Sequence, residues 1–432
     1  MQRVLSFQMT RNIGESSEYV TKRLCFSFLF SVGFVCLLCG FLLGRFTSEM
    51  SIKTQAQKIR DKLAGNGLQA TEHLQQMALT ELTKTSLDIT NWPMLYSERY
   101  INEVFSNLSF IHEVENDTLF IHATVHGSRE PDRYIILSVN GDGIAVALEL
   151  AEVLDRIYSA HDWLPQRSLI FCISLTSTDI CPQILPTFML EKVVAYIAVH
   201  GRFTQANNRV TLIGSDVIRS IAVEAIKTIP NGNWTYLENE VFGPRLSLNV
   251  PQVIFSFDDS NSTNSQTHHN QNLESRSLIL AQMVSQTIWR LSESIVIQWE
   301  PKYFNETVNE VLIESIDSSR FYLLIKDLKK RLDVLLAAVE DFNAKLDTMD
   351  ITQMLPVRIW NDLFLDLDKA LLCFDGKLQY SRTDLTIFRK ELLNYQSIES
   401  IRNTVDYLRE IKSCYLDAIE VLQKSFKKDI NF

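Results

Sequence analysis

Apolar and amphipathic runs alternate through the middle of the chain. Short β-rich apolar runs lie at 118–125, 133–139, 167–175 and 193–199, and the stretch 144–158 places apolar residues on one helical face. Buried strands separated by amphipathic helices are typical of parallel sheets with crossover helices. The pattern predicts an α/β domain over residues 117–300, with a mostly parallel sheet flanked by helices.

Helical periodicity replaces this pattern after Pro301. Residues 306–318, 321–346, 360–372 and 398–426 repeat apolar positions with the helical period, and strand-like runs fade. We therefore expect an all-α domain over residues 301–432.

The N-terminal part contains a stretch of 20 residues without a charge, at 24–43. At 1.5 Å per residue it can cross a hydrocarbon core of roughly 30 Å, and it exceeds the apolar region of a cleaved signal peptide. We predict a transmembrane signal anchor, preceded by a cytoplasmic tail at 1–23 and followed by a stalk within 44–116.

Glycosylation sequons give the orientation. All five lie after the apolar stretch: Asn107, Asn116, Asn233, Asn261 and Asn305. We therefore expect a single-pass type II membrane glycoprotein, at the cell surface or in the secretory pathway, with its C-terminal part lumenal or extracellular.

Composition narrows the class of protein. Of 432 residues, 46% are hydrophobic and 22% are charged, which is typical of a folded chain. The net charge of −10 is spread out without a basic patch, which excludes nucleic acid as an expected partner.

Four of the seven cysteines lie outside the apolar stretch. Cys373 and Cys414 are a plausible disulfide within the helical tail, although the sequence proves no pairing. Cys172 lies in the middle of a predicted strand, where we expect a buried thiol.

Four segments occur in an order that resembles the glutamate carboxypeptidase II and transferrin receptor family. They are VHGSREPDRYIIL (125–137), LPQRSLIF (164–171), AYIAVH (195–200) and LAQ with LSESIV (280–296). The resemblance covers roughly residues 117–432. It implies a zinc-peptidase-like α/β domain and a helical dimerisation domain, hence a homodimer through 301–432. The family's protease-associated domain does not fit, so 44–116 would hold a stalk and a remnant of the N-terminal ectodomain.

The resemblance also places the family's zinc site on this sequence. Asn140 stands for the first histidine ligand, Asp142 for a nearby aspartate, and Ser177 with Thr178 for the glutamate pair of general base and ligand. His200 stands for a further aspartate, and His268 or His269 for the last histidine. The family's bridging aspartate would fall in the loop after Asp142, which is shortened in this sequence. Asp142 itself is interpreted as a turn or helix-capping residue.

The resemblance therefore implies a degenerate member without metal or catalysis, acting as a receptor or scaffold for an unknown lumenal protein. The rival interpretation is a zinc-dependent carboxypeptidase that releases C-terminal, acidic residues. In a third interpretation the chain is a truncated or mispredicted gene product, which would explain the missing protease-associated domain and the shortened loop after Asp142. His200, His268 and His269 could hold another metal, but surface or loop histidines are the simpler interpretation.

Overall fold

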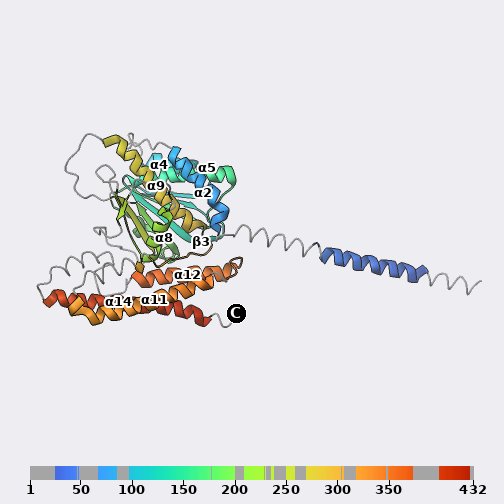
Figure 1. Cartoon of the computed structure of the whole chain (residues 1–432). Helices are drawn as coiled ribbons and strands as arrows, with labels where there is room; N and C mark the ends of the chain where they lie inside the picture. Colours follow the sequence, from blue (N-terminus) through green and yellow to red (C-terminus); the bar gives the residue numbers. More distant parts are fainter. Residues whose placement is uncertain are drawn as a thin grey trace, which may run out of the picture. The chain divides into compact units, whose positions relative to one another are not determined.

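The computed structural model divides the chain into two compact units, Met1–Lys62 and Leu63–Phe432 (Figure 1). The residues it describes are 25–45, 47, 67–84, 97–176, 178–199, 209–227, 229, 235–237, 250–257, 269–302, 304–305, 318–346, 349–372 and 398–428.

The first unit contains one apolar helix, Cys25–Arg45, with a mean hydropathy of 2.4. Its length and composition allow it to cross a membrane. A membrane anchor and a signal sequence both fit these properties.

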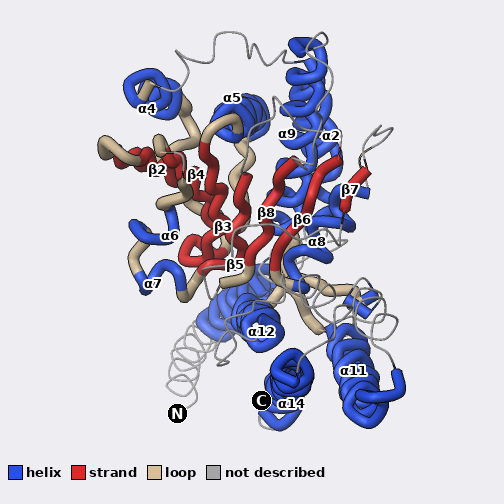
Figure 2. Tube along the Cα trace, turned by 90° about the vertical axis from the view of Figure 1, so that its left-hand side faces the viewer, coloured by secondary structure: helices blue, strands red, loops and turns tan. Residues whose placement is uncertain are grey.

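The second unit is built on a sheet of eight strands (Figure 2). Their order across the sheet is β1-β2-β4-β3-β5-β8-β6-β7. The strands are β1 (Glu113–Asn116), β2 (Phe120–Val125), β3 (Glu130–Asn140), β4 (Arg167–Ser174), β5 (Val193–Val199), β6 (Arg209–Gly214), β7 (Thr235–Leu237) and β8 (Gln252–Phe257). Strands β4, β3, β5 and β8 pair in parallel. β1 and β2 continue one side antiparallel, and β6 pairs antiparallel with β8 on the other.

Long helices cover one face of this sheet (Figures 1 and 2). They are α2 (Leu68–Lys84), α4 (Glu98–Asn107), α5 (Gly143–His161), α8 (Asp216–Lys227) and α9 (His269–Glu293). Buried apolar residues of these helices form a continuous core with Phe171 and the alternate residues of the strands. Within it, Trp163 stacks on Trp289 with ring centroids 4.7 Å apart.

The opposite face of the sheet carries a smaller core. Ile136, Ile170, Cys172 and Tyr196 pack there against the short helix α6 (Cys181–Ile184) and against Leu185. Helix α7 (Thr187–Leu190) follows and leads into β5.

The C-terminal part is helical, as predicted. It consists of α11 (Ser318–Leu346), α12 (Met354–Leu372) and α14 (Ile398–Lys428). Phe342 packs its ring against Trp360 and Phe364. Arg133 of β3 forms an ion pair with Asp362 of α12 at 2.5 Å, and Asp132 pairs with Arg358. The helical part therefore contacts the amino end of β3.

The predicted fold class is confirmed: a mixed α/β sheet with helices, a helical C-terminal part and one N-terminal apolar helix. The antiparallel strands β1 and β6 were not predicted. The predicted helix at 306–318 lies almost entirely outside the described residues.

Candidate functional site

Strand β3 ends in a tight turn at the carboxyl edge of the sheet. Asn140 is buried at the end of the strand, and Gly141 has φ +52°, a left-handed conformation that favours glycine. A Cβ on Gly143 would come within 2.8 Å of the Val199 carbonyl oxygen, so the turn packs closely against the end of β5. Asp142 occupies the N-cap position of α5, but its side chain makes no capping hydrogen bond. The turn prediction for Asp142 fits this geometry, whereas side-chain capping does not.

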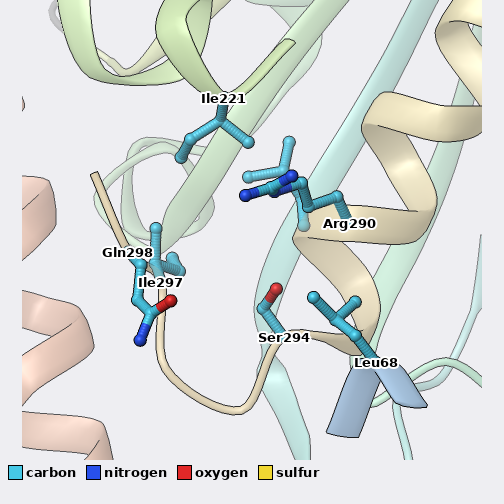
Figure 3. Close-up of a pocket in the computed structure, with 7 residues that line it drawn as sticks. Leu68, Ile221, Arg290, Ser294, Ile297 and Gln298 are labelled. Atoms are coloured by element: carbon cyan, nitrogen blue, oxygen red, sulfur yellow. The ribbon is translucent and has the colours of Figure 1, made fainter. Parts of the chain in front are cut away.

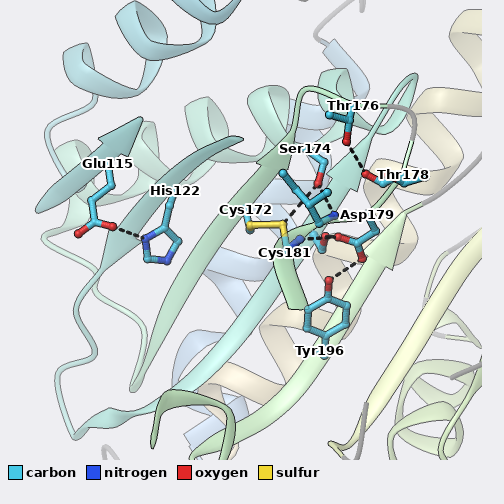
Figure 4. Close-up of a disulfide and its surroundings, with 11 residues drawn as sticks. Glu115, His122, Cys172, Ser174, Thr176, Thr178, Asp179, Cys181 and Tyr196 are labelled. Carbon is cyan, nitrogen blue, oxygen red and sulfur yellow. Dashed lines mark hydrogen bonds and ion pairs between the residues drawn. A yellow bond between two sulfur atoms is a disulfide. The ribbon is translucent and has the colours of Figure 1, made fainter. Parts of the chain in front are cut away.

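A disulfide closes the loop that follows β4. Cys172 in the strand is bonded to Cys181, the first residue of α6, with a Cα–Cα distance of 6.1 Å (Figure 4). Cys172 is buried as expected, but the expectation of a free thiol was wrong, because the chain turns back over the same face of the sheet after the strand. The disulfide holds the segment between the two cysteines against the carboxyl end of β4.

Within this loop, the Asp179 carboxylate accepts hydrogen bonds from Ser138, Cys181 and Tyr196. The Ser138 hydroxyl and the Cys181 N–H both donate to Oδ1, at 2.8 and 3.1 Å. The Tyr196 hydroxyl donates to Oδ2 at 2.5 Å (Figure 4). Burial, together with the charge of Asp179, raises the pKa of Tyr196 well above its usual value, so its hydroxyl keeps the proton that it donates. We call Ser138, Asp179 and Tyr196 the Asp179 cluster.

The same loop is fixed by two further hydrogen bonds. The Ile180 N–H donates to the Ser174 hydroxyl at 3.1 Å, and the Thr176 hydroxyl donates to the Thr178 carbonyl at 2.8 Å. Ser174 is buried, whereas Thr178 is exposed. Both oxygens of Asp179 and the hydroxyl of Ser174 thus serve the internal structure of the loop.

His122 of β2 lies on the same face, beside the disulfide. It is the register partner of both Glu115 and Cys172, and its Nδ1 lies 3.8 Å from the Glu115 carboxylate. Burial lowers the pKa of His122, although the charges of Glu115 and Glu113 oppose this effect. Its buried Nε2 has no hydrogen-bond partner within the described part of the chain.

The structure brings only part of the predicted site together. Asn140 and Asp142 lie at the end of β3, and Thr178 lies in the loop after β4. Ser177, His200 and His268 lie outside the described residues. His269 is the first residue of α9, but its side chain is not among those described. Sequence reasoning missed the Asp179 cluster, which the Ser-Thr-Asp run before Cys181 could have suggested.

The predicted glycosylation sites and the predicted disulfide of the helical tail lie only partly within the described residues. Asn107 ends α4 and Asn116 ends β1, and both side chains are exposed, whereas Asn305 is half-buried. Asn233 and Asn261 lie outside the described residues. Cys414 is disulfide-bonded, but Cys373 lies outside the described residues, so the Cys373–Cys414 pairing stays a prediction.

The described donor groups at this edge do not form a zinc centre. Zinc is held in proteins by imidazole, thiolate and carboxylate ligands, whereas Asn140 offers an amide and Asp179 already accepts hydrogen bonds on both oxygens. No group of three or more His, Cys, Asp or Glu among the described residues is arranged to hold a metal ion.

A small cavity lies elsewhere, beside the C-terminal end of α9 (Figure 3). Its volume of about 20 Å³ has room for roughly one water molecule. It is lined by Leu68, Ile221, Arg290, Leu291, Ser294, Ile297 and Gln298. Its size excludes it as a substrate site.

No family model matches the chain, and no curated protein matches it. Among solved structures, the chain is similar to BSAP, a zinc aminopeptidase from Bacillus subtilis, with 11% identity and a TM-score of 0.32 over 40% of this chain and 52% of that one. It is also similar to the LapA aminopeptidase of Legionella pneumophila (11% identity, TM-score 0.33, 51% and 69% covered). A peptidase M28 precursor from Shewanella amazonensis matches at 18% identity, with a TM-score of 0.30 over 42% and 46%. The chain spans about half the length of the Bacillus enzyme. These partial likenesses are to peptidase folds and carry no argument about activity or about a particular family.

Proposed function

We propose that this chain is a non-catalytic, membrane-anchored glycoprotein, in which a peptidase-like α/β scaffold serves as a receptor or scaffold surface. The observation that carries the proposal is the Asp179 cluster. Asp179 lies in the loop after the carboxyl end of β4, at the edge where α/β enzymes place their reactive groups, and its donors Ser138 and Tyr196 lie on the neighbouring strands β3 and β5. There the carboxylate is held by Ser138, Tyr196 and the Cys181 N–H inside a disulfide-closed loop.

A metallopeptidase needs several metal ligands and a carboxylate that is free to take a proton from the attacking water. To act in this way, Asp179 would have to give up hydroxyl donors at 2.8 and 2.5 Å. The raised pKa of Tyr196 keeps its hydroxyl protonated, so this donor stays available to Asp179. The arrangement favours a structural carboxylate.

The remaining parts of the proposal rest on the sequence. The apolar helix Cys25–Arg45 would anchor the chain with type II topology, and the glycosylation sequons would face the lumen or cell exterior. The Cys172–Cys181 disulfide supports this orientation, since disulfides persist in oxidising compartments. The resemblance to the transferrin receptor and glutamate carboxypeptidase II family supports a homodimer through residues 301–432 and a lumenal or extracellular protein ligand.

A hydrolysis assay tests the absence of catalysis. Full-length protein purified in detergent is incubated with peptides that end in acidic residues and with aminoacyl peptides, with added zinc or with a chelator. A zinc carboxypeptidase serves as the positive control, and Asp179→Ala is the matched variant. We expect the same background release from the wild type and the variant. Chelator-sensitive release that Asp179→Ala abolishes would establish the rival interpretation, a zinc peptidase.

A further inference from the structure

Helix α11 exposes one continuous face along its length. Leu323, Lys326, Lys330, Val334, Ala337, Asp341 and Ala344 are all exposed, and their spacing of three and four residues places them on one stripe. Leu323 is 78% exposed and Val334 is 41% exposed, so the stripe carries apolar side chains near its start and at its middle. Lys329, Asp333 and Glu340 flank the stripe on one side and are also exposed. We call these residues the α11 face.

Charge along this face is segregated toward its two ends, with the acidic Asp333 in the middle. The lysines 326, 329 and 330 lie in the N-terminal half of the helix, whereas Glu340 and Asp341 lie in the C-terminal half. The helix dipole would favour the reverse order, so the helix itself does not account for the arrangement.

Most charges of this face have no ion-pair partner within the described part of the chain. Lys329, Lys330, Glu340 and Asp341 form no ion pair in the described residues. Lys326 also forms no ion pair with the described residues, and its Nζ lies 5.8 Å from the ring centroid of its neighbour Tyr322. By contrast, Asp327, on the side of α11 that faces α14, pairs with Lys412 and with Arg331. Asp327 is therefore paired within the chain, whereas Lys329, Glu340 and Asp341 form no ion pair with the described residues.

We propose that the α11 face binds the same face of a second copy of this chain, with the two helices antiparallel about a two-fold axis close to Val334. This interface rests on the proposed function, because it presupposes that the chain forms a homodimer through residues 301–432. In a two-fold interface each residue meets its partner in reversed order, so a surface of this kind must be complementary to itself.

The register follows from the helix geometry. Lys326 and Asp341 lie at equal distances, about 11 Å, on either side of the point between residues 333 and 334. Antiparallel pairing about this point places Lys326 opposite Asp341 of the second copy and Lys329 close to its Glu340. It also brings the Asp333 side chains of the two copies near each other beside the axis, a like-charge contact that the two sets of opposite charges must outweigh. Each pair occurs twice because of the symmetry. The small side chain of Ala337 lies opposite Lys330, and Leu323 lies opposite Ala344, so apolar contacts extend to both ends of the stripe.

Charge reversal tests the pairing on full-length protein in lipid nanodiscs or detergent, with the mass of the complex measured over a dilution series. We expect Lys326→Glu with Lys329→Glu to weaken self-association by at least about tenfold, and Glu340→Lys with Asp341→Lys to do the same. Combining all four changes restores opposite charges across the axis and should return the affinity to within about threefold of the wild type. The exposed Lys302→Glu is the control and should have no effect. Recovery in the fourfold variant also shows that the double variants had not simply unfolded.

Cysteine pairing tests the direction of the helices, in a background in which Cys25, Cys36 and Cys39 are replaced by serine. Val334→Cys should form an interchain disulfide under mild oxidation, because it lies near the axis. Ala344→Cys alone should not, whereas a mixture of Leu323→Cys and Ala344→Cys chains should. A monomeric wild type would overturn the proposal. So would a dimer whose affinity does not change with the charge reversals and in which Val334→Cys forms no interchain disulfide. Neither result would affect the hydrolysis assay, so the proposed lack of catalysis is tested separately.

Discussion

Arg167 and Glu130 form an ion pair that is buried at the amino end of β3 and β4. The Arg167 Nε lies 2.8 Å from the Glu130 carboxylate, and the two side chains are 1% and 7% exposed. The guanidinium also donates to three carbonyl oxygens at the end of α9 and just after it, those of Leu291, Ser294 and Ile295. Asn361 of α12 donates to the same Ile295 carbonyl at 3.0 Å. This cluster joins the sheet, the end of α9 and the helical part.

Replacing Arg167 by methionine should destabilise the protein strongly. The change leaves the Glu130 carboxylate buried without its partner and removes the donors to the three carbonyls, an effect of about 3–5 kcal/mol for a broken buried pair. Urea denaturation followed by tryptophan fluorescence measures the loss. The control is Arg156→Met, because the Arg156 side chain is 45% exposed and its ion pair with Glu149 is long, at 3.8 Å. Equal urea midpoints for the two variants would show that the buried ion pair does not join the sheet, the end of α9 and the helical part.

Asp368 should make stability depend on pH. Its Oδ1 accepts a hydrogen bond from the Val217 N–H at the start of α8, and its Oδ2 is buried without a partner within the described part of the chain. Burial raises the pKa of Asp368 from the usual 3.8 to about 6. The folded state therefore holds this proton more tightly than the unfolded state. The resulting stabilisation is complete below pH 3.8 and is lost as the pH rises through about 6.

The size of this effect is about 3 kcal/mol, because one pKa unit corresponds to about 1.4 kcal/mol. Asp368→Asn keeps an acceptor for Val217 and removes the titration. The stability difference between pH 4.5 and pH 7.5 should therefore shrink in this variant and stay unchanged in the exposed control Asp417→Asn. If the stability of Asp368→Asn depends on pH as strongly as that of the wild type, other groups cause the pH dependence.

The Cys172–Cys181 disulfide can be tested by peptide mapping. Both cysteines fall between Arg167 and Lys192, so trypsin leaves them in one peptide, and a second cleavage before Asp179 separates them. Without reductant the two fragments should stay linked, and reduction should release them. Replacing both cysteines by alanine should cost about 2–3 kcal/mol, because the bond closes a short loop. Separate, alkylated fragments in the unreduced digest would contradict the structure of this loop.

Glycosylation tests the orientation of the chain. We expect Asn107 and Asn116 to carry glycans, because both are exposed and lie after the apolar helix. Asn116→Gln and Thr118→Ala disrupt the same sequon and should each remove one glycosidase-sensitive step in gel mobility. If the wild type shows no such sensitivity when expressed in mammalian cells, the proposed type II topology is wrong.

The sequence predicted the central strands and the helical C-terminal part, but not the contacts that fix the candidate site. Apolar runs such as 133–139 and 193–199 are local patterns, and β3 and β5 follow them closely. The role of Asp179 depends on donors that lie 41 and 17 residues away, at Ser138 and Tyr196, and a local pattern does not contain such pairings. The burial of Cys172 could be predicted from its position in the strand. Its disulfide bond could not, because it depends on the chain turning back over the strand within nine residues.

The zinc content of the full-length protein tests the central claim most directly. Protein purified without chelators, equilibrated with a small excess of zinc and then freed of unbound metal is analysed by elemental mass spectrometry, beside a zinc aminopeptidase as reference. The account predicts far less than one zinc ion per chain, and the same value for Asp179→Ala. Two zinc ions per chain in the wild type, lost in Asp179→Ala, would show that Asp179 belongs to a metal centre and would contradict the account.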